Sequence, residues 1–182
     1  AAQGVVYRTL DGGDTWTRAL TTPTTSWADF YALAINPITP SILYAGGYQS
    51  DAVSRPAVVY RSTDGGDTWT QVLTATVGGE QQFTALAVHP LTPSMVYAGS
   101  QNPKYVYRSS DGGETWQQVR YDRGFRLALD PPATVYAADD WREIDRSLAN
   151  GDAGTWAKVG ANTAGLIQSM AIDLGPSPGA IY

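Results

Sequence analysis

The chain of 182 residues has no cysteine, only two lysines and a single histidine. The lack of cysteine excludes disulfides, thiolate metal sites and cysteine nucleophiles. No apolar run approaches the ~18 residues that a membrane-spanning helix needs, so no transmembrane segment is predicted. The first residues, AAQG, contain no charged start followed by an apolar stretch, so no signal peptide is visible there.

Basic residues are few and scattered. Lysine and arginine together number 12 against 17 acidic residues, which gives a net charge of −5 and a pI near 4.6. Because no basic patch is visible, nucleic acid is not expected as a partner. An acidic, cysteine-free composition that is rich in threonine and poor in lysine is associated with an extracytoplasmic location, which is the location we expect.

A helical signal is also missing, because no window shows sustained apolar spacing of 3.6 residues. The chain is instead rich in glycine (19), proline (11), tyrosine (11) and tryptophan (6). These residues favour short strands separated by turns. We therefore expect an all-β protein.

Two sequence blocks recur along the chain. One contains the triplet DGG and appears three times, as VYRTLDGGDTW at 6–16, VYRSTDGGDTW at 59–69 and VYRSSDGGETW at 106–116. The other reads FYALAINPITPSILYAG at 30–46, with related copies at 83–99, 125–138 and 167–182. Equivalent positions in this second block lie 53, 41 and 43 residues apart. Repeats of about 40 to 50 residues are the size of one four-stranded propeller blade.

Each repeat divides into four strands, represented by ALAI, LYAG, VVYRS and TWTQV, which predicts a β-propeller of four-stranded antiparallel blades. The chain is expected to form one domain over 1–182 with four blade-equivalents. Three arrangements remain open: a self-closed ring of four blades, two chains that exchange halves to close eight blades, or an arc of a larger ring. The predicted units are a half-blade at 1–20, blades at 30–73, 83–119 and 124–159, and a half-blade at 165–182.

The pattern S/T-x-D-G-G-x-T-W resembles the Asp-box, or BNR, repeat. With the second block it makes the chain similar to the sortilin-like, photosystem-assembly-factor and xyloglucanase-type propellers. The resemblance covers almost the whole chain and implies a β-propeller whose hairpins carry the motif. Those relatives include receptors, assembly factors and enzymes, so the resemblance does not choose a function.

The motif has a physical explanation that needs no catalysis. Its aspartate can accept hydrogen bonds from backbone N–H groups of its own turn, its glycines permit positive φ, and its tryptophan anchors the hairpin. Calcium is the alternative role, but the spacing does not match a twelve-residue calcium loop. We predict no metal and no cofactor. The residues predicted to be structural are Asp11, Gly13, Trp16, Asp64, Gly66, Trp69, Asp111, Gly113, Trp116 and, in a degenerate fourth turn, Trp156.

Antiparallel order places all the DGG motifs at one end of the blades. The only histidine, His89, belongs to the same end and occupies the slot held by Asn36 and Asp130 in other repeats, so we predict a turn residue and not a general base. At the opposite end the loops differ from repeat to repeat, and variable loops on a repetitive frame are where binding usually resides. The alternative is that the tryptophans there only cap blade edges. The candidate binding residues are Trp27, Tyr48, Asp139, Asp140, Trp141 and Arg142.

Enzyme activity is not the favoured interpretation. Glycosidases need two carboxylates that flank one bond, and no acid occupies the first-strand positions expected to face the axis. The arginines that a sialidase would cluster recur here at one repeat position, which indicates a structural role. That set is Arg8, Arg61, Arg108 and Arg146.

The sequence thus predicts a non-enzymatic scaffold that binds a protein or a glycan through the end opposite the DGG motifs. The alternative is a glycoside hydrolase or polysaccharide-binding fragment in which Asp139, Asp140 or Glu143 supplies an acid. A third interpretation is a structural subunit that pairs with another copy through its open sheet edges.

Overall fold

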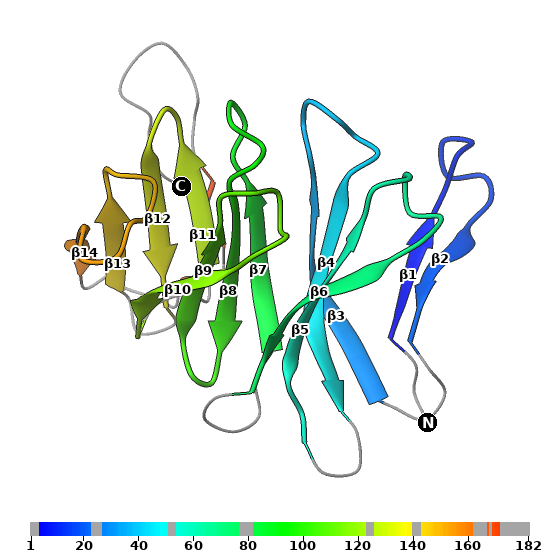
Figure 1. The fold of residues 1–182 in the computed structure, drawn as a ribbon, viewed down its shortest axis with the longest axis horizontal. Helices are drawn as coiled ribbons and strands as arrows, with labels where there is room; N and C mark the ends of the chain where they lie inside the picture. The colour runs from blue at the N-terminus through cyan, green and yellow to red at the C-terminus, as the bar shows by residue number, and fades with distance from the viewer. Residues whose placement is uncertain are drawn as a thin grey trace.

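The computed structural model describes residues 4–22, 27–50, 54–76, 82–122, 126–139, 143–161, 167 and 169–171. Within these ranges the regular structure consists of β-strands (Figure 1), and no helix is present that could cross a membrane. The strands are β1 (Val5–Arg8), β2 (Thr17–Thr21), β3 (Trp27–Ile35), β4 (Leu43–Ser50), β5 (Ala57–Ser62), β6 (Thr70–Ala75), β7 (Gln82–Val88), β8 (Val96–Gln101), β9 (Tyr105–Ser109), β10 (Gln117–Tyr121), β11 (Arg126–Asp130), β12 (Thr134–Ala138), β13 (Glu143–Ser147) and β14 (Trp156–Ala161).

The strands form four antiparallel sheets in sequence order. The first sheet holds only β1 and β2, whereas the second (β3 to β6), third (β7 to β10) and fourth (β11 to β14) each hold four strands. Figure 1 shows the sheets side by side in an arc, with the first and fourth at its two ends. Among the described strands β1 pairs only with β2, so one edge of the first sheet is open. Most of the half-blade expected at 165–182 lies outside the described residues.

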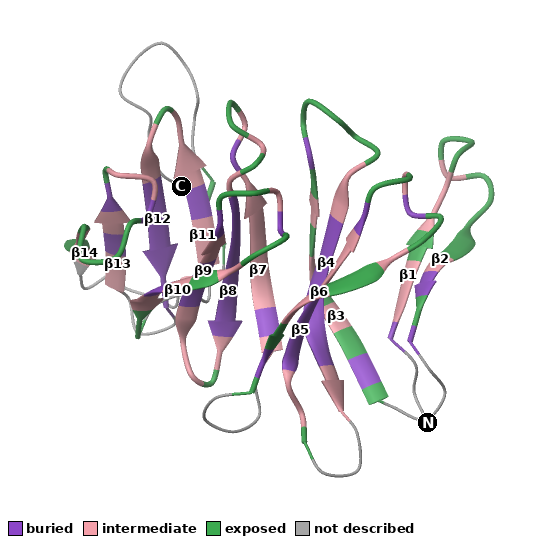
Figure 2. Ribbon diagram, viewed as in Figure 1, coloured by how far each residue is buried: buried purple, intermediate pink, exposed green. Residues whose placement is uncertain are grey.

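The second strand of each complete sheet carries small residues where neighbouring sheets approach. In β4 the run LYAGG alternates small and aromatic residues, and Tyr44 and Ala45 are buried. The corresponding strands β8 and β12 repeat this pattern with YAG and YAA. Figure 2 shows the buried positions concentrated along these middle strands, while the turns are mostly exposed.

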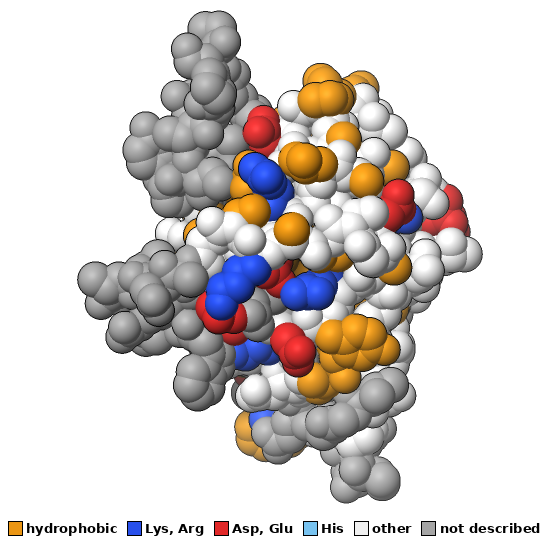
Figure 3. Space-filling view, turned by 90° about the vertical axis from the view of Figure 1, so that its left-hand side faces the viewer, with side chains coloured by type: hydrophobic (Ala, Val, Ile, Leu, Met, Phe, Trp, Pro, Cys, Tyr) orange, Lys and Arg blue, Asp and Glu red, His pale blue; other side chains and the backbone are white. Residues whose placement is uncertain are grey.

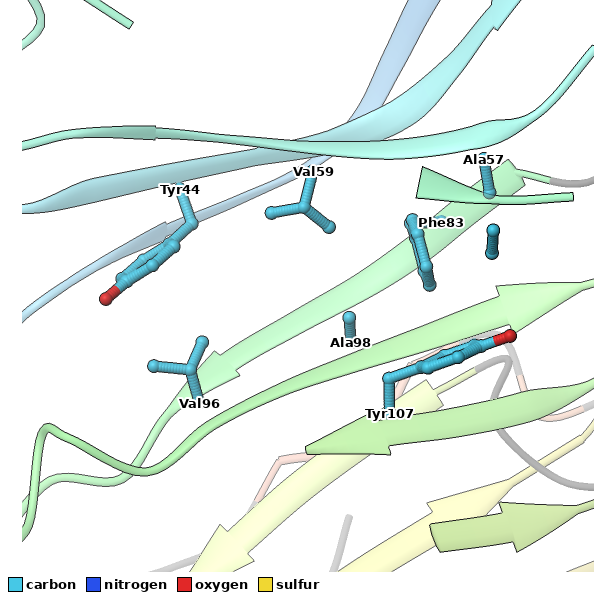
Figure 4. Close-up of a cluster of buried hydrophobic side chains, with 8 residues drawn as sticks. Tyr44, Ala57, Val59, Phe83, Val96, Ala98 and Tyr107 are labelled. Atoms are coloured by element: carbon cyan, nitrogen blue, oxygen red, sulfur yellow. The ribbon is translucent and has the colours of Figure 1, made fainter. Parts of the chain in front are cut away.

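One hydrophobic cluster joins the second and third sheets. Figure 4 shows Tyr44 and Val59 of the second sheet pointing toward Phe83, Val96 and Tyr107 of the third. The rings of Phe83 and Tyr107 meet edge to face with centroids 5.5 Å apart. Because aromatic side chains bury the most apolar area, these two rings dominate the interface.

A second cluster joins the third and fourth sheets, and an ion pair with a buried carboxylate also crosses this interface. Tyr97, Val106 and Val135 are fully buried there. Arg120 of β10 donates to Asp145 Oδ2 of β13 from Nε at 3.0 Å and from Nη2 at 2.5 Å. Asp145 is only 1% exposed, whereas the Arg120 side chain is 32% exposed, so the bond joins a buried carboxylate to a partly exposed guanidinium across the interface.

A β-bulge in β3 changes the direction of its side chains. The register with β4 shifts between Phe30 and Ala32, so that Tyr31 is the extra residue. Gly47 makes the bulge possible, because a Cβ there would lie 1.8 Å from the carbonyl oxygen of Asp29. The bulge separates an outer part of β3, which includes Trp27, from an inner part that lines the axis.

Candidate functional site

The DGG turns (9–16, 62–69 and 109–116) are held by one repeated set of hydrogen bonds. In the second turn, Asp64 Oδ1 accepts from the Thr68 backbone N–H at 2.9 Å and Oδ2 accepts from the Thr68 hydroxyl at 2.5 Å. Ser62 Oγ accepts from the Gly66 N–H at 2.8 Å, and the Trp69 indole donates to the Gly66 carbonyl at 3.1 Å. Gly65 and Gly66 have φ of +75° and +94°, which other residues rarely adopt.

The hydrogen bonds from the threonine, then from the serine or threonine before the motif, lower the pKa of Asp11, Asp64 and Asp111 well below the usual range. Each carboxylate is therefore ionised, and both of its oxygens accept hydrogen bonds from residues of its own turn. Among the described residues, no group of three or more His, Cys, Asp or Glu could hold a metal ion.

The fourth turn, residues 147–156, keeps the shape without the aspartate. Ser147 Oγ accepts from the Gly151 N–H at 3.1 Å, as its counterparts do in the other turns. The Trp156 indole donates to the Gly151 carbonyl at 3.3 Å. The hydroxyls of Ser147 and Thr155 bond each other directly at 2.6 Å, in the place that the carboxylate bridges elsewhere.

The histidine at this end is part of a turn. His89 is buried, its ring Nδ1 accepts from the Thr92 N–H at 3.0 Å, and its backbone N–H donates to the Met95 carbonyl. Asn36 does the same in the previous repeat, where its Oδ1 accepts from the N–H groups of Ile38 and Thr39. The hydrogen bonds of His89 are those of a turn residue, because its Nδ1 already accepts from the Thr92 N–H.

Apolar side chains line the axial opening at the same end. A pocket of about 440 Å³ is lined by the first strands of the three complete sheets, including Leu33, Leu86 and Leu127. Met170 and Ala171 line it too, beside β11. No carboxylate is among the described residues that line this pocket.

The opposite end of the second sheet carries an exposed aromatic group, which we name the Trp27 surface. Trp27 and Tyr31 of β3 are 56% and 50% exposed. The Tyr31 ring stacks on the Tyr48 ring of β4 with centroids 6.2 Å apart, and the Arg55 guanidinium lies 3.7 Å above the Tyr48 ring. The surface consists of Trp27, Asp29, Tyr31, Tyr48 and Arg55.

Asp29 and Arg55 both contact the Tyr48 side chain of this surface. The Tyr48 hydroxyl donates to Asp29 Oδ2 at 2.7 Å. Burial, followed by this bond, raises the pKa of Tyr48, and burial followed by the charge of Asp29 raises the pKa of Tyr31. Both phenols therefore stay protonated donors at neutral pH, and Arg55 lies over the face of the buried ring. The surface is preorganised, with two aromatic rings open to solvent.

The predicted candidates fall into three groups. Trp27 and Tyr48 belong to the Trp27 surface. Asp139 is 2% exposed; its Oδ1 accepts from the Glu143 N–H at 3.4 Å and its Oδ2 lies 3.7 Å from Lys104 Nζ, so it joins the third and fourth sheets. Three further candidates, Asp140, Trp141 and Arg142, lie outside the described residues.

Three members of the Trp27 surface were missed by sequence reasoning. Asp29 and Tyr31 follow Trp27 at alternate positions in WADFY, which is the spacing of one face of a strand. That spacing could have marked them. Arg55 carried no such signal, because its place over Tyr48 depends on the path of the loop between β4 and β5.

Comparison with known proteins adds fold information only. No protein-family model matches the sequence, and no curated protein matches it. Solved structures do match, and three of them are β-propellers with low sequence identity. The first is described as YCF48 bound to D1 peptide; it is 18% identical with a TM-score of 0.60 over 93% of this chain and 51% of that one.

The second is the GH74 xyloglucanase from Xanthomonas campestris, 19% identical with a TM-score of 0.60 over 80% of this chain and 24% of that one. The third is Chaetomium thermophilum Sqt1 bound to the N-terminus of the ribosomal protein L10, 15% identical with a TM-score of 0.57 over 84% and 42%. The fold is a β-propeller. The chain spans about half the length of YCF48, and the predicted all-β propeller architecture is confirmed.

Proposed function

We propose that this propeller chain is a non-enzymatic binding or assembly module whose Trp27 surface contacts a protein or a glycan. The observation that carries the proposal is the exposure of Trp27 and Tyr31 on a base that is already ordered by Asp29, Tyr48 and Arg55. Binding to such a base orders few additional side chains, so more of the contact energy appears as affinity.

The composition of the surface favours a protein segment over a glycan. Tryptophan, tyrosine and arginine are the residues enriched at protein interfaces and at their energetic centres. Asp29 and Arg55 add one charge of each sign, which suits a peptide with both donors and acceptors. Two propellers of similar fold are described with a bound peptide or protein N-terminus, which supports this class of partner.

Replacing Trp27 and Tyr31 together by alanine should weaken binding by about tenfold or more, because exposed aromatic anchors carry most of the energy of such contacts. The measurement is the binding of the purified chain to an immobilised array of 15-residue peptides of varied charge and to arabino- and xyloglucan oligosaccharides.

The matched control is Leu91→Ala, which removes an exposed apolar side chain at the end that carries the DGG turns. It should leave every affinity unchanged. Absence of binding to any probe, or binding that does not respond to Trp27→Ala with Tyr31→Ala, would contradict the proposal. Stronger binding to the oligosaccharides than to the peptides would show that the partner is a glycan and not a protein.

The hydrolase remains the second candidate function, because one similar fold belongs to a xyloglucanase. Of its proposed acids, Asp139 is buried and Glu143 pairs with Lys158, while Asp140 is outside the described residues. Release of reducing sugar from xyloglucan or arabinan that is lost in Glu143→Gln or Asp140→Asn would favour this candidate.

Three further parts of the proposal rest on the sequence. The DGG turns are proposed to be Asp-box repeats, on the motif that they share. The location is proposed to be extracytoplasmic, on composition. Pairing with another copy through open sheet edges is proposed from the incomplete first sheet.

A further inference from the structure

Several acidic side chains are neutralised inside the fold. Asp67, Glu114 and Asp152 pair with arginines of the neighbouring sheet. Glu143 pairs with Lys158 within the fourth sheet. Figure 3 views the molecule from the side of the fourth sheet and shows basic and acidic side chains next to one another. Because each of these acids has a basic partner in the chain, it adds little attraction for a charged ligand.

Asp29 of the Trp27 surface differs from these acids. It is exposed on β3, and it forms no ion pair with any residue that the structure describes. The Tyr48 hydroxyl, a neutral donor, bonds Asp29 Oδ2 at 2.7 Å. A carboxylate has about four acceptor sites, so this bond orients the group and leaves further sites for another donor. The negative charge of Asp29 is therefore held in place without a cation against it.

Two exposed rings flank this carboxylate. Trp27 stands two residues before Asp29 and Tyr31 two residues after it, so the three side chains follow one another along β3 at intervals of about 7 Å. A guanidinium that bonds the carboxylate can at the same time lay its flat face on one of these rings. An acid between two half-exposed aromatic side chains is thus an arrangement that suits a planar cation.

The three side chains point away from the first sheet. Ala28, between Trp27 and Asp29, is buried on the other side of β3, where a Cβ at Gly4 would lie 2.9 Å from the Ala28 Cβ. Tyr31 stacks on Tyr48, which bonds Asp29, so Tyr31 stays on the side of Asp29 despite the bulge. The first sheet therefore packs on the opposite side of β3 from the exposed acid and rings.

One contact of the expected kind already exists in this surface. The Arg55 guanidinium lies 3.7 Å from the centroid of the Tyr48 ring, whose hydroxyl bonds Asp29. With Arg55 in this place, Trp27 and Tyr31 are still 56% and 50% exposed. The surface thus holds one arginine of its own and presents two more rings beside the carboxylate.

We propose that the Trp27 surface binds an extended protein segment through an arginine of that segment, whose guanidinium pairs with Asp29 and stacks on the ring of Trp27 or Tyr31. This inference rests on the proposed function and names its partner class. Alternate side chains of an extended segment are also about 7 Å apart, which matches the spacing along β3. The net charge of −5 attracts a basic segment, whereas a neutral glycan would leave the charge of Asp29 unbalanced.

The test starts from the peptide that binds the wild-type chain most tightly in the array described above. We expect this peptide to contain an arginine whose replacement by glutamine weakens binding by about tenfold, the combined effect of an ion pair and a stacked guanidinium. Lysine in its place should recover only part of the affinity, because an ammonium group lacks the flat face. Raising NaCl to about 0.5 M should reduce the difference between the arginine and glutamine peptides. These measurements use the wild-type chain, so they do not depend on the folding of a variant.

Asp29→Asn should remove the preference for the arginine peptide over the glutamine peptide, while its amide oxygen still accepts from the Tyr48 hydroxyl. Asp29→Lys should reverse the order, so that a glutamate peptide binds more tightly than the arginine peptide. The matched control is Asp14→Asn, which makes the same change of charge at an exposed position of the first DGG turn. It should leave the preference unchanged.

The outcomes separate this inference from the proposed function. Binding that requires Trp27 and Tyr31 but is equally strong for the arginine and glutamine peptides, or that keeps its preference in Asp29→Asn, would overturn the inference and leave the proposed function standing. A lysine peptide that binds as tightly as the arginine peptide would overturn the assignment to arginine. Tighter binding of neutral oligosaccharides than of arginine peptides would overturn it as well. No binding to any probe would overturn both proposals.

Discussion

Phe83→Ala should lower the free energy of unfolding by about 3–5 kcal/mol, the range for removing a buried aromatic side chain. Phe83 is fully buried between the second and third sheets, where its ring meets Tyr107 at its edge. The cavity would open on Val59 and Ala98, whose positions are fixed by two different sheets (Figure 4). Such a site cannot collapse by moving one strand alone, so we expect a cost in the upper part of the range.

The measurement is urea unfolding followed by tryptophan fluorescence. Phe83→Leu keeps most of the volume and should recover more than half of the loss. Leu91→Ala, an exposed position, should change stability by less than about 0.5 kcal/mol. A loss for Phe83→Ala no larger than for Leu91→Ala would mean that the two sheets do not pack through this cluster.

Arg120→Met should cost about 3–5 kcal/mol, because it removes a cation from a buried carboxylate. Asp145 is 1% exposed and accepts two bonds from the Arg120 guanidinium. Methionine keeps much of the side-chain volume of arginine, so the change tests the charge and not the packing. The same unfolding measurement reports the result.

The double variant Arg120→Met with Asp145→Leu should recover at least half of this loss, because it no longer buries a carboxylate that has lost Arg120. Arg18→Met, at an exposed position of β2, serves as the control and should change stability by less than about 0.5 kcal/mol. If the double variant were as unstable as the sum of the single variants, the ion pair would not be the source of the loss.

The architecture could be predicted from the sequence because the information is repeated. Each copy of the DGG motif places a turn, and each copy of the ALAI and YAG runs places the two inner strands, so an error in one repeat is corrected by the others. The fourth turn departs from the motif, yet Ser147 and Trp156 still mark its start and end.

The proposed binding surface could be predicted only in part, because its residues do not recur from repeat to repeat. Trp27 and Tyr48 were identified from loop variability, but the bulge that brings Tyr31 against Tyr48 depends on Gly47, whose role is visible only in the pairing of β3 with β4. Asp139 stands in a variable loop and is nevertheless buried. Its carboxylate is used by the Glu143 N–H and by Lys104, a contact between repeats that no periodicity reveals.

The ion pairs between neighbouring sheets show the same limit, because they too join different repeats: Arg8 pairs with Asp67, Arg61 with Glu114 and Arg108 with Asp152. The four arginines were predicted to be structural because they recur, and three of them pair with acids in the next turn. Sequence periodicity could not show that the pairing always runs to the following repeat.

The central claim is that the DGG turns stabilise the fold, whereas the Trp27 surface binds a protein or a glycan. It is tested most directly by measuring thermal unfolding and affinity for one array probe in two paired variants, Asp64→Ala with Asp111→Ala and Trp27→Ala with Tyr31→Ala. We expect the first pair to lower Tm and leave Kd unchanged, and the second to weaken Kd and leave Tm nearly unchanged. A weaker Kd in the folded aspartate variant, with no effect of the aromatic pair, would contradict the account.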